Sequence, residues 1–203
     1  MNDCKKYDYI IAGSGCSGMS LLYRILKEPV LKSKKILVIN NAKKTTNDRT
    51  WCYWERKDGI FESIVTHRWK YLNFFSTDFS KKLNLKKYTY KMIRGIDFYS
   101  FILNFSKDFE NVTFKYENIT KIYSSNQKGY ISTNKSKYIA KYIFNSTNLF
   151  NPKITIKNSL LQHFEGWFIK TKDSSFNPNT GTLMDFRLEQ KNGATFFLCP
   201  SYF

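Results

Sequence analysis

Three glycines near the start of the chain, Gly13, Gly15 and Gly18, follow the spacing G-x-G-x-x-G between an apolar run and a helix-like run. In this motif the first glycine permits a tight turn, the second lets the backbone approach a pyrophosphate, and the third lets a helix lie close to a strand. The helix N-terminus then offers free N–H groups and a positive dipole end to the phosphates. The predicted cofactor contacts in this segment are Gly13, Ser14, Gly15, Cys16, Ser17 and Gly18.

The segments around the motif favour this interpretation over a turn that is only structural. "YDYIIAG" is a short apolar run with β-branched residues and predicts a buried strand. "GMSLLYRILKEP" places Met19, Leu22, Tyr23 and Leu26 on one helical face, and "KKILVIN" predicts a second buried strand. Strand, glycine turn, helix and strand together predict a βαβ dinucleotide-binding unit.

One position departs from the usual pattern of this unit. An acid that binds the ribose hydroxyls is expected near the end of the second strand, but Asn40 and Asn41 stand there. An amide oxygen still accepts a hydroxyl proton, and the loss of charge costs about 1 kcal/mol. Asn40 is therefore retained as a predicted cofactor contact, with binding weakened several-fold.

The remaining elements extend an α/β pattern. Residues 41–59 predict a surface loop, and Phe98, Phe101, Ile102, Phe105 and Phe109 predict an amphipathic helix capped by Asp97. Short strands follow at 112–116, 119–123 and 130–133, and "YIAKYIFNST" predicts a return strand. The order shows an α/β fold with antiparallel additions, and it is the order of a glutathione-reductase-type FAD-binding Rossmann domain with a β-meander.

The chain changes character after residue 150. "QHFEGWFIKT", "GTLMDFRLEQ" and "ATFFLCPSYF" predict three aromatic-rich antiparallel strands. We interpret 1–150 as the dinucleotide-binding domain and 151–203 as the beginning of a substrate-domain sheet. Because the sequence stops inside an apolar run, it is expected to be truncated.

Composition excludes several classes of protein. The 203 residues carry a formal charge of +17, but the lysines are scattered among Asn, Ile, Tyr and Phe, which predicts no nucleic-acid partner. The four cysteines are far apart and show neither metal-ligand spacing nor a disulfide pattern, so no metal site is predicted. No apolar window is long enough for a membrane-spanning helix, and reduced thiols favour a cytoplasmic location.

Six segments together resemble the bacterial lycopene β-cyclases. They are "YDYIIAGSGCSGMSLL", "NDRTWCYWE", "YKMIRGIDFY", "YIFNST", "QHFEGWFI" and "TLMDFRLEQ…FFLCP". The similarity is collinear over essentially the whole chain and corresponds to the N-terminal half of the family's length. "DRTW", "QHFEGW" and "LMDFR" are the more specific motifs.

The resemblance implies an FAD enzyme that acts on the long polyene lycopene, peripherally at a membrane surface. In the family, a carboxylic acid protonates the terminal double bond, a ring closes through a carbocation, and loss of a proton leaves a β-ionone ring. The reaction involves no net redox change, although the FAD must be reduced, with NAD(P)H as the ultimate donor. Arg49 of "DRTW" joins the predicted cofactor contacts, as does Arg94, for which a solvent-exposed role is the alternative.

Candidate catalytic groups lie in the last third of the chain. Asp185, set among apolar residues in "LMDFR", is the first candidate for the acid or for a group that positions it, and an ion pair with Arg187 is the alternative. Glu165 is a second candidate, and the resemblance implies a further acid shortly after residue 203. The predicted aromatic walls of the substrate pocket, for which ordinary sheet packing is the alternative, are Phe164, Trp167, Phe186 and Phe196.

Two alternative functions remain open from the residues. One is another FAD enzyme of the same fold, either a monooxygenase or a prenyl reductase. The other is a non-catalytic basic binding module, which would bind nucleic acid in a salt-dependent way and take up no flavin.

Overall fold

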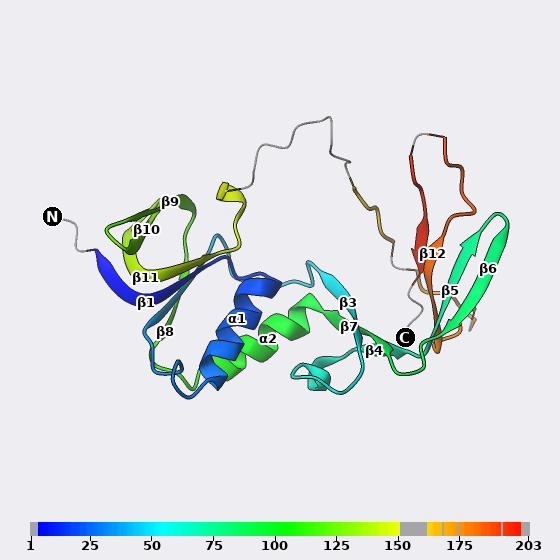
Figure 1. Cartoon of the computed structure of the whole chain (residues 1–203), viewed down its shortest axis with the longest axis horizontal. Helices are drawn as coiled ribbons and strands as arrows, with labels where there is room; N and C mark the ends of the chain where they lie inside the picture. Colours follow the sequence, from blue (N-terminus) through cyan, green and yellow to red (C-terminus); the bar gives the residue numbers. More distant parts are fainter. Residues whose placement is uncertain (1–3, 151–161, 168, 174, 192, 200–203) are drawn as a thin grey trace. The chain divides into compact units, whose positions relative to one another are not determined.

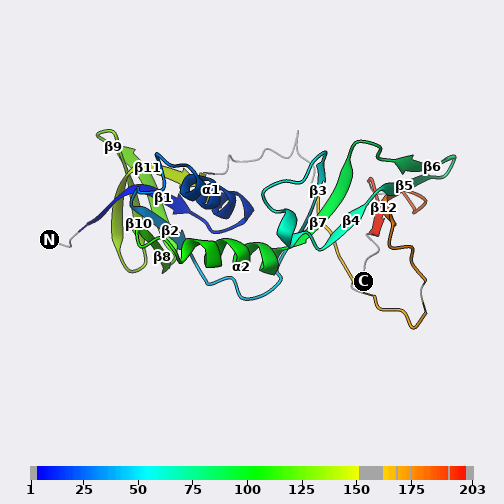
Figure 2. The same cartoon turned by 90° about the horizontal axis from the view of Figure 1, so that it is seen from below.

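The computed structural model describes residues 4–150, 162–167, 169–173, 175–191 and 193–199. The chain divides into two compact units, and each is assembled from two segments: residues 1–46 with 96–161, and residues 47–95 with 162–203. The sequence analysis divided the chain once, at residue 150. In the structure the chain leaves the first unit after residue 46 and returns to it at residue 96. The regular elements are drawn in Figures 1 and 2.

The first unit is built on a six-stranded sheet of order β8-β2-β1-β11-β10-β9. Its first four members are parallel to one another, and β10 and β9 are added antiparallel. The strands are β1 (Lys5–Ala12), β2 (Ile36–Asn40), β8 (Val112–Tyr116), β9 (Ile119–Ser125), β10 (Lys128–Thr133) and β11 (Lys137–Asn145). The predicted βαβ unit and the predicted strands from 112 to the return strand are therefore confirmed.

Two helices, α1 (Cys16–Lys27) and α2 (Gly95–Ser106), lie side by side against this sheet (Figure 1). Their aromatic faces meet where the Tyr23 ring packs 5.4 Å from that of Phe101 and 4.8 Å from that of Phe105. The periodicity predicted both helices. The predicted bounds of the second helix were wrong, because α2 begins two residues before Asp97 and ends at Ser106, before Phe109.

The second unit contains two smaller sheets. Sheet β3-β7-β4 is antiparallel and includes β3 (Thr50–Glu55), β4 (His67–Trp69) and β7 (Thr89–Arg94). Sheet β13-β12-β5-β6 includes β5 (Tyr71–Ser76), β6 (Phe79–Asn84), β12 (Thr180–Asp185) and β13 (Phe197–Cys199). Short 3-10 turns lie at η1 (Glu62–Ile64) and, in the first unit, η2 (Asn148–Phe150).

The sequence prediction was least accurate in this unit. The predicted loop at 41–59 contains β3, and β4 to β7 were not predicted. The predicted strand at 162–171 was wrong for its described residues, which form no regular structure, whereas "GTLMDFRLEQ" contains most of β12. β12 pairs in parallel with β5 and antiparallel with β13, so the sheet is mixed.

A buried lysine joins the elements of the β3-β7-β4 sheet. The side chain of Lys91 on β7 is only 3% exposed, and its Nζ donates hydrogen bonds to Glu55 (2.8 Å), Asp58 (3.3 Å) and Glu62. Glu62 also accepts a hydrogen bond from Nε of Arg68 at 2.9 Å. Burial alone would lower the pKa of Lys91 and raise that of Glu62, but these hydrogen bonds reverse both shifts and keep both groups charged.

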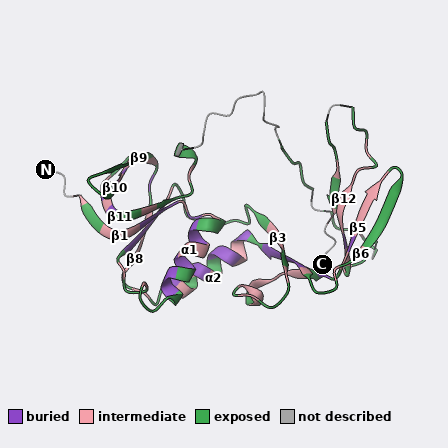
Figure 3. Ribbon diagram, in the orientation of Figure 1, coloured by how far each residue is buried: buried purple, intermediate pink, exposed green. Residues whose placement is uncertain are grey.

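Burial follows the layers of each unit. The most buried side chains lie on the central strands and on the facing sides of α1 and α2, while β6 is exposed along nearly its whole length (Figure 3). A smaller core of Trp69, Leu72, Tyr90 and Met92 lies in the second unit. None of the helices in the described ranges is long and apolar enough to cross a membrane.

Candidate functional site

The glycine-rich turn joins β1 to α1 and is held at both sides. Gly13 has φ of +105°, a left-handed conformation that favours glycine, and a Cβ at this position would overlap the Ser146 hydroxyl. The Gly13 N–H donates to the Ile39 carbonyl at 2.8 Å, and Ser146 donates its N–H and its hydroxyl to the Ala12 carbonyl. The end of β2 and the residue after β11 therefore fix the turn.

The other two glycines have different surroundings. A Cβ on Gly18 would overlap the carbonyl oxygen of Gly13 and lie 3.1 Å from Cγ2 of Ile11, so glycine allows α1 to lie this close to β1. A Cβ on Gly15 would meet nothing within 4 Å. The space over Gly15 is thus open to an approaching group, and a side chain there would fill it.

The N-terminus of α1 is suited to an anion. Its N-cap, Gly15, makes no side-chain capping hydrogen bond, and the first turn contains no acid, while Arg24 and Lys27 lie in the last turn. The first N–H groups and the positive end of the helix dipole therefore face the glycine turn without a competing carboxylate. Cys16 and Ser17 open the helix and are exposed. Desolvation of the sulfur raises the pKa of the Cys16 thiol, which favours the neutral thiol.

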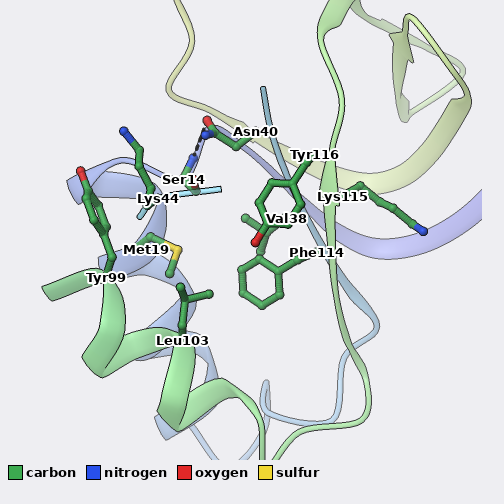
Figure 4. A pocket seen from close by; sticks show the side chains of 10 residues that line it. All are labelled: Ser14, Met19, Val38, Asn40, Lys44, Tyr99, Leu103, Phe114, Lys115 and Tyr116. Atoms are coloured by element: carbon green, nitrogen blue, oxygen red, sulfur yellow. Dashed lines mark hydrogen bonds between the residues drawn. The ribbon is translucent and has the colours of Figure 1, made fainter. Parts of the chain in front are cut away.

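A pocket lies beside this turn, between the helices and the C-terminal ends of the parallel strands (Figure 4). Ligands bind at this edge of open α/β sheets. The free space is small, about 10 Å³, and one of its lining side chains, Tyr116, is 39% exposed. The lining residues are Ser14, Met19, Val38, Asn40, Lys44, Tyr99, Leu103, Phe114, Lys115 and Tyr116.

Asn40 connects the glycine turn to the end of β2. Its Oδ1 accepts a hydrogen bond from the Ser14 N–H at 3.4 Å, and its Nδ2 donates to the Ala42 carbonyl at 2.8 Å (Figure 4 shows the first of these). Its backbone carbonyl accepts from the Glu117 N–H at 2.8 Å. The carboxamide thus both accepts and donates a hydrogen bond. An aspartate at this position would have no N–H group to donate to the Ala42 carbonyl.

The two predicted arginines lie at the same end of the β3-β7 pair in the second unit. Arg94 pairs with Thr50 across β7 and β3, and the Gly95 N–H donates to the Arg49 carbonyl at 2.7 Å. Both arginines are exposed at this end of the ladder, and Arg49 donates from Nη1 to the Asp48 carbonyl at 3.0 Å. Sequence alone did not show that they are neighbours, and their contact with a cofactor stays a prediction.

Asp185 forms the ion pair that was the alternative to a catalytic role. Arg187 donates to it through two side-chain nitrogens, Nε at 2.9 Å and Nη2 at 2.6 Å. These hydrogen bonds hold the pKa of Asp185 below its ordinary value. This arrangement favours the ionised form of Asp185, and its catalytic role stays a prediction. Glu165, the second candidate, is exposed and accepts a hydrogen bond from the Trp167 indole N–H at 3.2 Å.

Three of the four predicted wall residues are in contact. The ring of Phe196 lies 5.5 Å from that of Phe186 and 6.0 Å from that of Phe164, and Phe186 lies 5.6 Å from Phe74. Phe164 and Trp167 are 71% and 79% exposed, so these rings form an open apolar surface. Phe74 was missed because its strand was not predicted.

No cluster of three or more His, Cys, Asp or Glu side chains within the described ranges is arranged to hold a metal ion. The features in these ranges that could bind a ligand are the open glycine turn, the N-terminus of α1 and the aromatic surface.

The first unit defines an α/β protein with the fold of flavin-dependent enzymes, and comparisons with known proteins agree. The model of the family described as "Lycopene cyclase protein" matches residues 8–199, and the chain belongs to this family. The predicted family and fold class are therefore confirmed. Comparison with curated protein sequences gave no match.

Several solved structures share the fold at low sequence identity. PqsL of Pseudomonas aeruginosa, described as a probable FAD-dependent monooxygenase, has a TM-score of 0.52 and 12% identity, covering 68% of this chain and 42% of its own. The p-nitrophenol 4-monooxygenase PnpA of Pseudomonas putida DLL-E4 has a TM-score of 0.54 and 11% identity, covering 68% and 40%. The halogenase PltM, solved with phloroglucinol and FAD, has a TM-score of 0.50 and 14% identity, covering 70% and 34%. The chain thus spans less than half the length of each of these proteins.

Proposed function

We propose that this chain supplies the FAD-binding part and the start of the substrate domain of a lycopene β-cyclase. The observation that carries the proposal is the family match over residues 8–199, which includes both the glycine turn and the aromatic surface. The FAD-bound halogenase and the monooxygenases of the same fold support the choice of cofactor.

The residues of the first unit fit the diphosphate of FAD. Gly15 leaves open space that a Cβ would fill, and the uncapped N-terminus of α1 offers N–H donors to an anion. Asn40 would hold the ribose through its carboxamide, as the residue at the end of β2 does in this fold. Arg49 and Arg94 would add positive charge on the second unit.

The proposed reaction closes a β-ionone ring at each ψ-end of lycopene, giving γ-carotene and then β-carotene. The glycine turn and the N-terminus of α1 would hold the FAD, which in its reduced, anionic form would supply negative charge that stabilises a carbocation. The chain's aromatic residues would exclude water, which would otherwise trap the cation as an alcohol. Phe186 and Phe196 would also attract the cation by about 0.5–2 kcal/mol each.

The proton must come from a carboxylic acid that is neutral at working pH. Because Arg187 keeps Asp185 ionised, we assign Asp185 a positioning role on β12 and expect the donor among the acids that the family carries after residue 203. NAD(P)H is the proposed source of electrons for the flavin. Peripheral association with a bilayer, in which lycopene dissolves, is favoured by the formal charge of +17.

The test is conversion of lycopene by the full-length gene product in cells that accumulate it. We expect orange β-carotene, identified by its absorption spectrum and by a mass equal to that of lycopene, since cyclisation is an isomerisation. A product heavier by one oxygen atom would identify a monooxygenase, and one heavier by two hydrogen atoms a reductase. Unchanged lycopene, with expression and flavin content verified, would contradict the proposal.

A further inference from the structure

We propose that a second pocket of the first unit, at the edge of the sheet where its parallel strands begin, binds a small organic phosphate. The ligand is either free in solution or the headgroup of an anionic phospholipid, because the same chemistry holds both. The pocket includes Tyr7 near the start of β1, about 20 Å along the strand from the glycine turn. The inference goes beyond the proposed function and does not depend on it, because it concerns the other end of the sheet.

The pocket has room for such a ligand. Its volume is about 360 Å³, which is in the range of pockets that hold small molecules. Its lining comes from β1, β10 and β11 and from the residue that precedes β2, so all of it belongs to the first unit. The lining residues are Lys6, Tyr7, Asp8, Lys35, Lys128, Ile139, Ala140 and Lys141.

The lining is strongly positive. Four lysines and one acid, Asp8, give it a formal charge of +3. Asp8 is already engaged, because its Oδ1 lies 2.9 Å from Nζ of Lys141 and its Oδ2 accepts a hydrogen bond from the Lys35 backbone N–H at 3.0 Å. These two hydrogen bonds hold the pKa of Asp8 below its ordinary value, so Asp8 stays charged and compensates one lysine.

The other three ammonium groups are left for an anion. Within the part of the chain that the structure describes, Lys6, Lys35 and Lys128 form no ion pair. All three side chains are exposed and reach solvent at the pocket. Like charges gathered in this way repel one another, and a bound anion would relieve that repulsion.

Apolar side chains lie beside these lysines. Ala140 is buried, Tyr7 is half-buried, and the Tyr7 ring packs 6.2 Å from the ring of Tyr138. The Lys35 Nζ lies 5.1 Å from the centroid of the Tyr7 ring, so one cation and one aromatic ring are close together in the lining. A ligand with an anionic group joined to an apolar body would contact both.

A phosphate matches this charge better than a carboxylate does. A phosphate monoester carries about two negative charges near pH 7, whereas a carboxylate carries one. Lysine binds phosphate as a point charge and needs no fixed fork geometry, so three separate ammonium groups can share one phosphate group. The apolar part of the lining favours an organic phosphate over inorganic phosphate.

The first experiment compares two probes that differ by an aromatic ring. Binding of phenyl phosphate and of inorganic phosphate to the 203-residue chain is measured by isothermal titration calorimetry. We expect phenyl phosphate to bind about three- to tenfold more tightly, because its ring contacts the apolar side chains. No binding of phenyl phosphate, or binding no tighter than that of inorganic phosphate, would overturn the inference.

Vesicles distinguish the two sources of the ligand. Co-sedimentation is measured with phosphatidylcholine vesicles that contain or lack phosphatidic acid, whose headgroup is a phosphate monoester. Sedimentation only with phosphatidic acid, reversed by phenyl phosphate, would support the inference with a lipid headgroup as the ligand. Binding of phenyl phosphate without such sedimentation would support it with a free organic phosphate.

A double variant locates the site. Lys35→Gln combined with Lys128→Gln is expected to weaken phenyl phosphate binding by about tenfold. Its control combines Lys121→Gln with Lys135→Gln, which removes the same charge from exposed lysines of the same unit outside the lining. Lys121 is closely matched to Lys35, because its Nζ lies 5.1 Å from the centroid of the Tyr123 ring. We expect the control to change the Kd by less than about twofold, and equal losses would contradict the inference.

A third variant is expected to gain affinity, which misfolding cannot produce. Asp8→Asn removes the acid of the lining and releases Lys141, so phenyl phosphate should bind about two- to fivefold more tightly. Unchanged or weaker binding would count against the site.

FAD titration separates this inference from the proposed function. None of the altered residues lines the pocket beside the glycine turn, so each variant should bind FAD as the wild-type chain does. Phenyl phosphate binding without FAD binding would contradict the proposed function and support the phosphate site. FAD binding without phenyl phosphate binding would do the reverse.

Discussion

Gly18→Ala is expected to destabilise the first unit without any ligand present. The added Cβ would lie closer than 3.0 Å to the Gly13 carbonyl oxygen and 3.1 Å from Cγ2 of Ile11. The first of these is a backbone atom that Ser146 and β2 hold in place through the turn. Either α1 or the turn must shift, and overpacking of this kind costs about 1–3 kcal/mol, or about 2–12 °C in Tm for a chain of this size.

Gly15→Ala is the matched control, three residues away in the same motif. Gly15 has φ of −79°, which alanine adopts, and a Cβ there meets nothing within 4 Å. We expect its Tm to stay within about 2 °C of wild type. Its effect should fall on ligand affinity, because the methyl group occupies the space that a diphosphate would enter.

The assay is thermal unfolding followed by far-ultraviolet circular dichroism in the absence of FAD, then FAD titration by fluorescence. We expect Gly18→Ala to lower the Tm. We expect Gly15→Ala to keep the wild-type Tm and to bind FAD more weakly. An unchanged Tm for Gly18→Ala, or an equal loss for both variants, would refute the packing argument.

Three further outcomes are expected. Arg187→Gln should raise the pKa of Asp185 toward its ordinary value, because the hydrogen bonds that lower it are lost, and carbon-detected NMR titration measures this. The lowered pKa of Glu62 stabilises the fold above its unfolded-state pKa, and this stability is lost as pH falls through the folded pKa. Glu62→Gln should therefore lower the free energy of unfolding by about 1–3 kcal/mol near neutrality and weaken its dependence on pH in the acidic range, as measured by urea unfolding. An unchanged pH dependence would contradict the assignment. FAD at about 100 times its Kd should raise the free energy of unfolding by about 2.7 kcal/mol, and a ligand-independent Tm would exclude FAD binding.

The first unit was largely predictable because its signals are local. Alternating or continuous apolar runs, a helical stripe and three glycines together specify β1, α1 and β2, and each glycine's surroundings agree with the conformational reason for its presence. The bounds of α2 were less predictable, since the apolar stripe continues to Phe109 although the helix ends at Ser106.

The second unit was poorly predictable because its strands depend on distant partners. The polar and aromatic mixture of β3 gives no clear alternation, and its pairing with β7 includes the salt bridge between Glu55 and Lys91. β12 pairs with β5, which is far away in the sequence, so no local pattern could show that they share a sheet. The same dependence limited the prediction of the candidate site. The place of Phe74 on β5 and the proximity of Arg49 to Arg94 both follow from strand pairings that no local pattern shows.

The position of β1 at the centre of its sheet has a consequence for synthesis on the ribosome. β1 obtains one neighbour from β2 soon after both emerge, but its other neighbour, β11, pairs with it through residues as late as Asn145. At about 5–20 residues per second the delay is on the order of ten seconds, during which an apolar strand edge stays open on the nascent chain. Until β11 emerges, this edge of β1 is available for pairing with other chains, and the strand order therefore exposes the nascent polypeptide to aggregation during that interval.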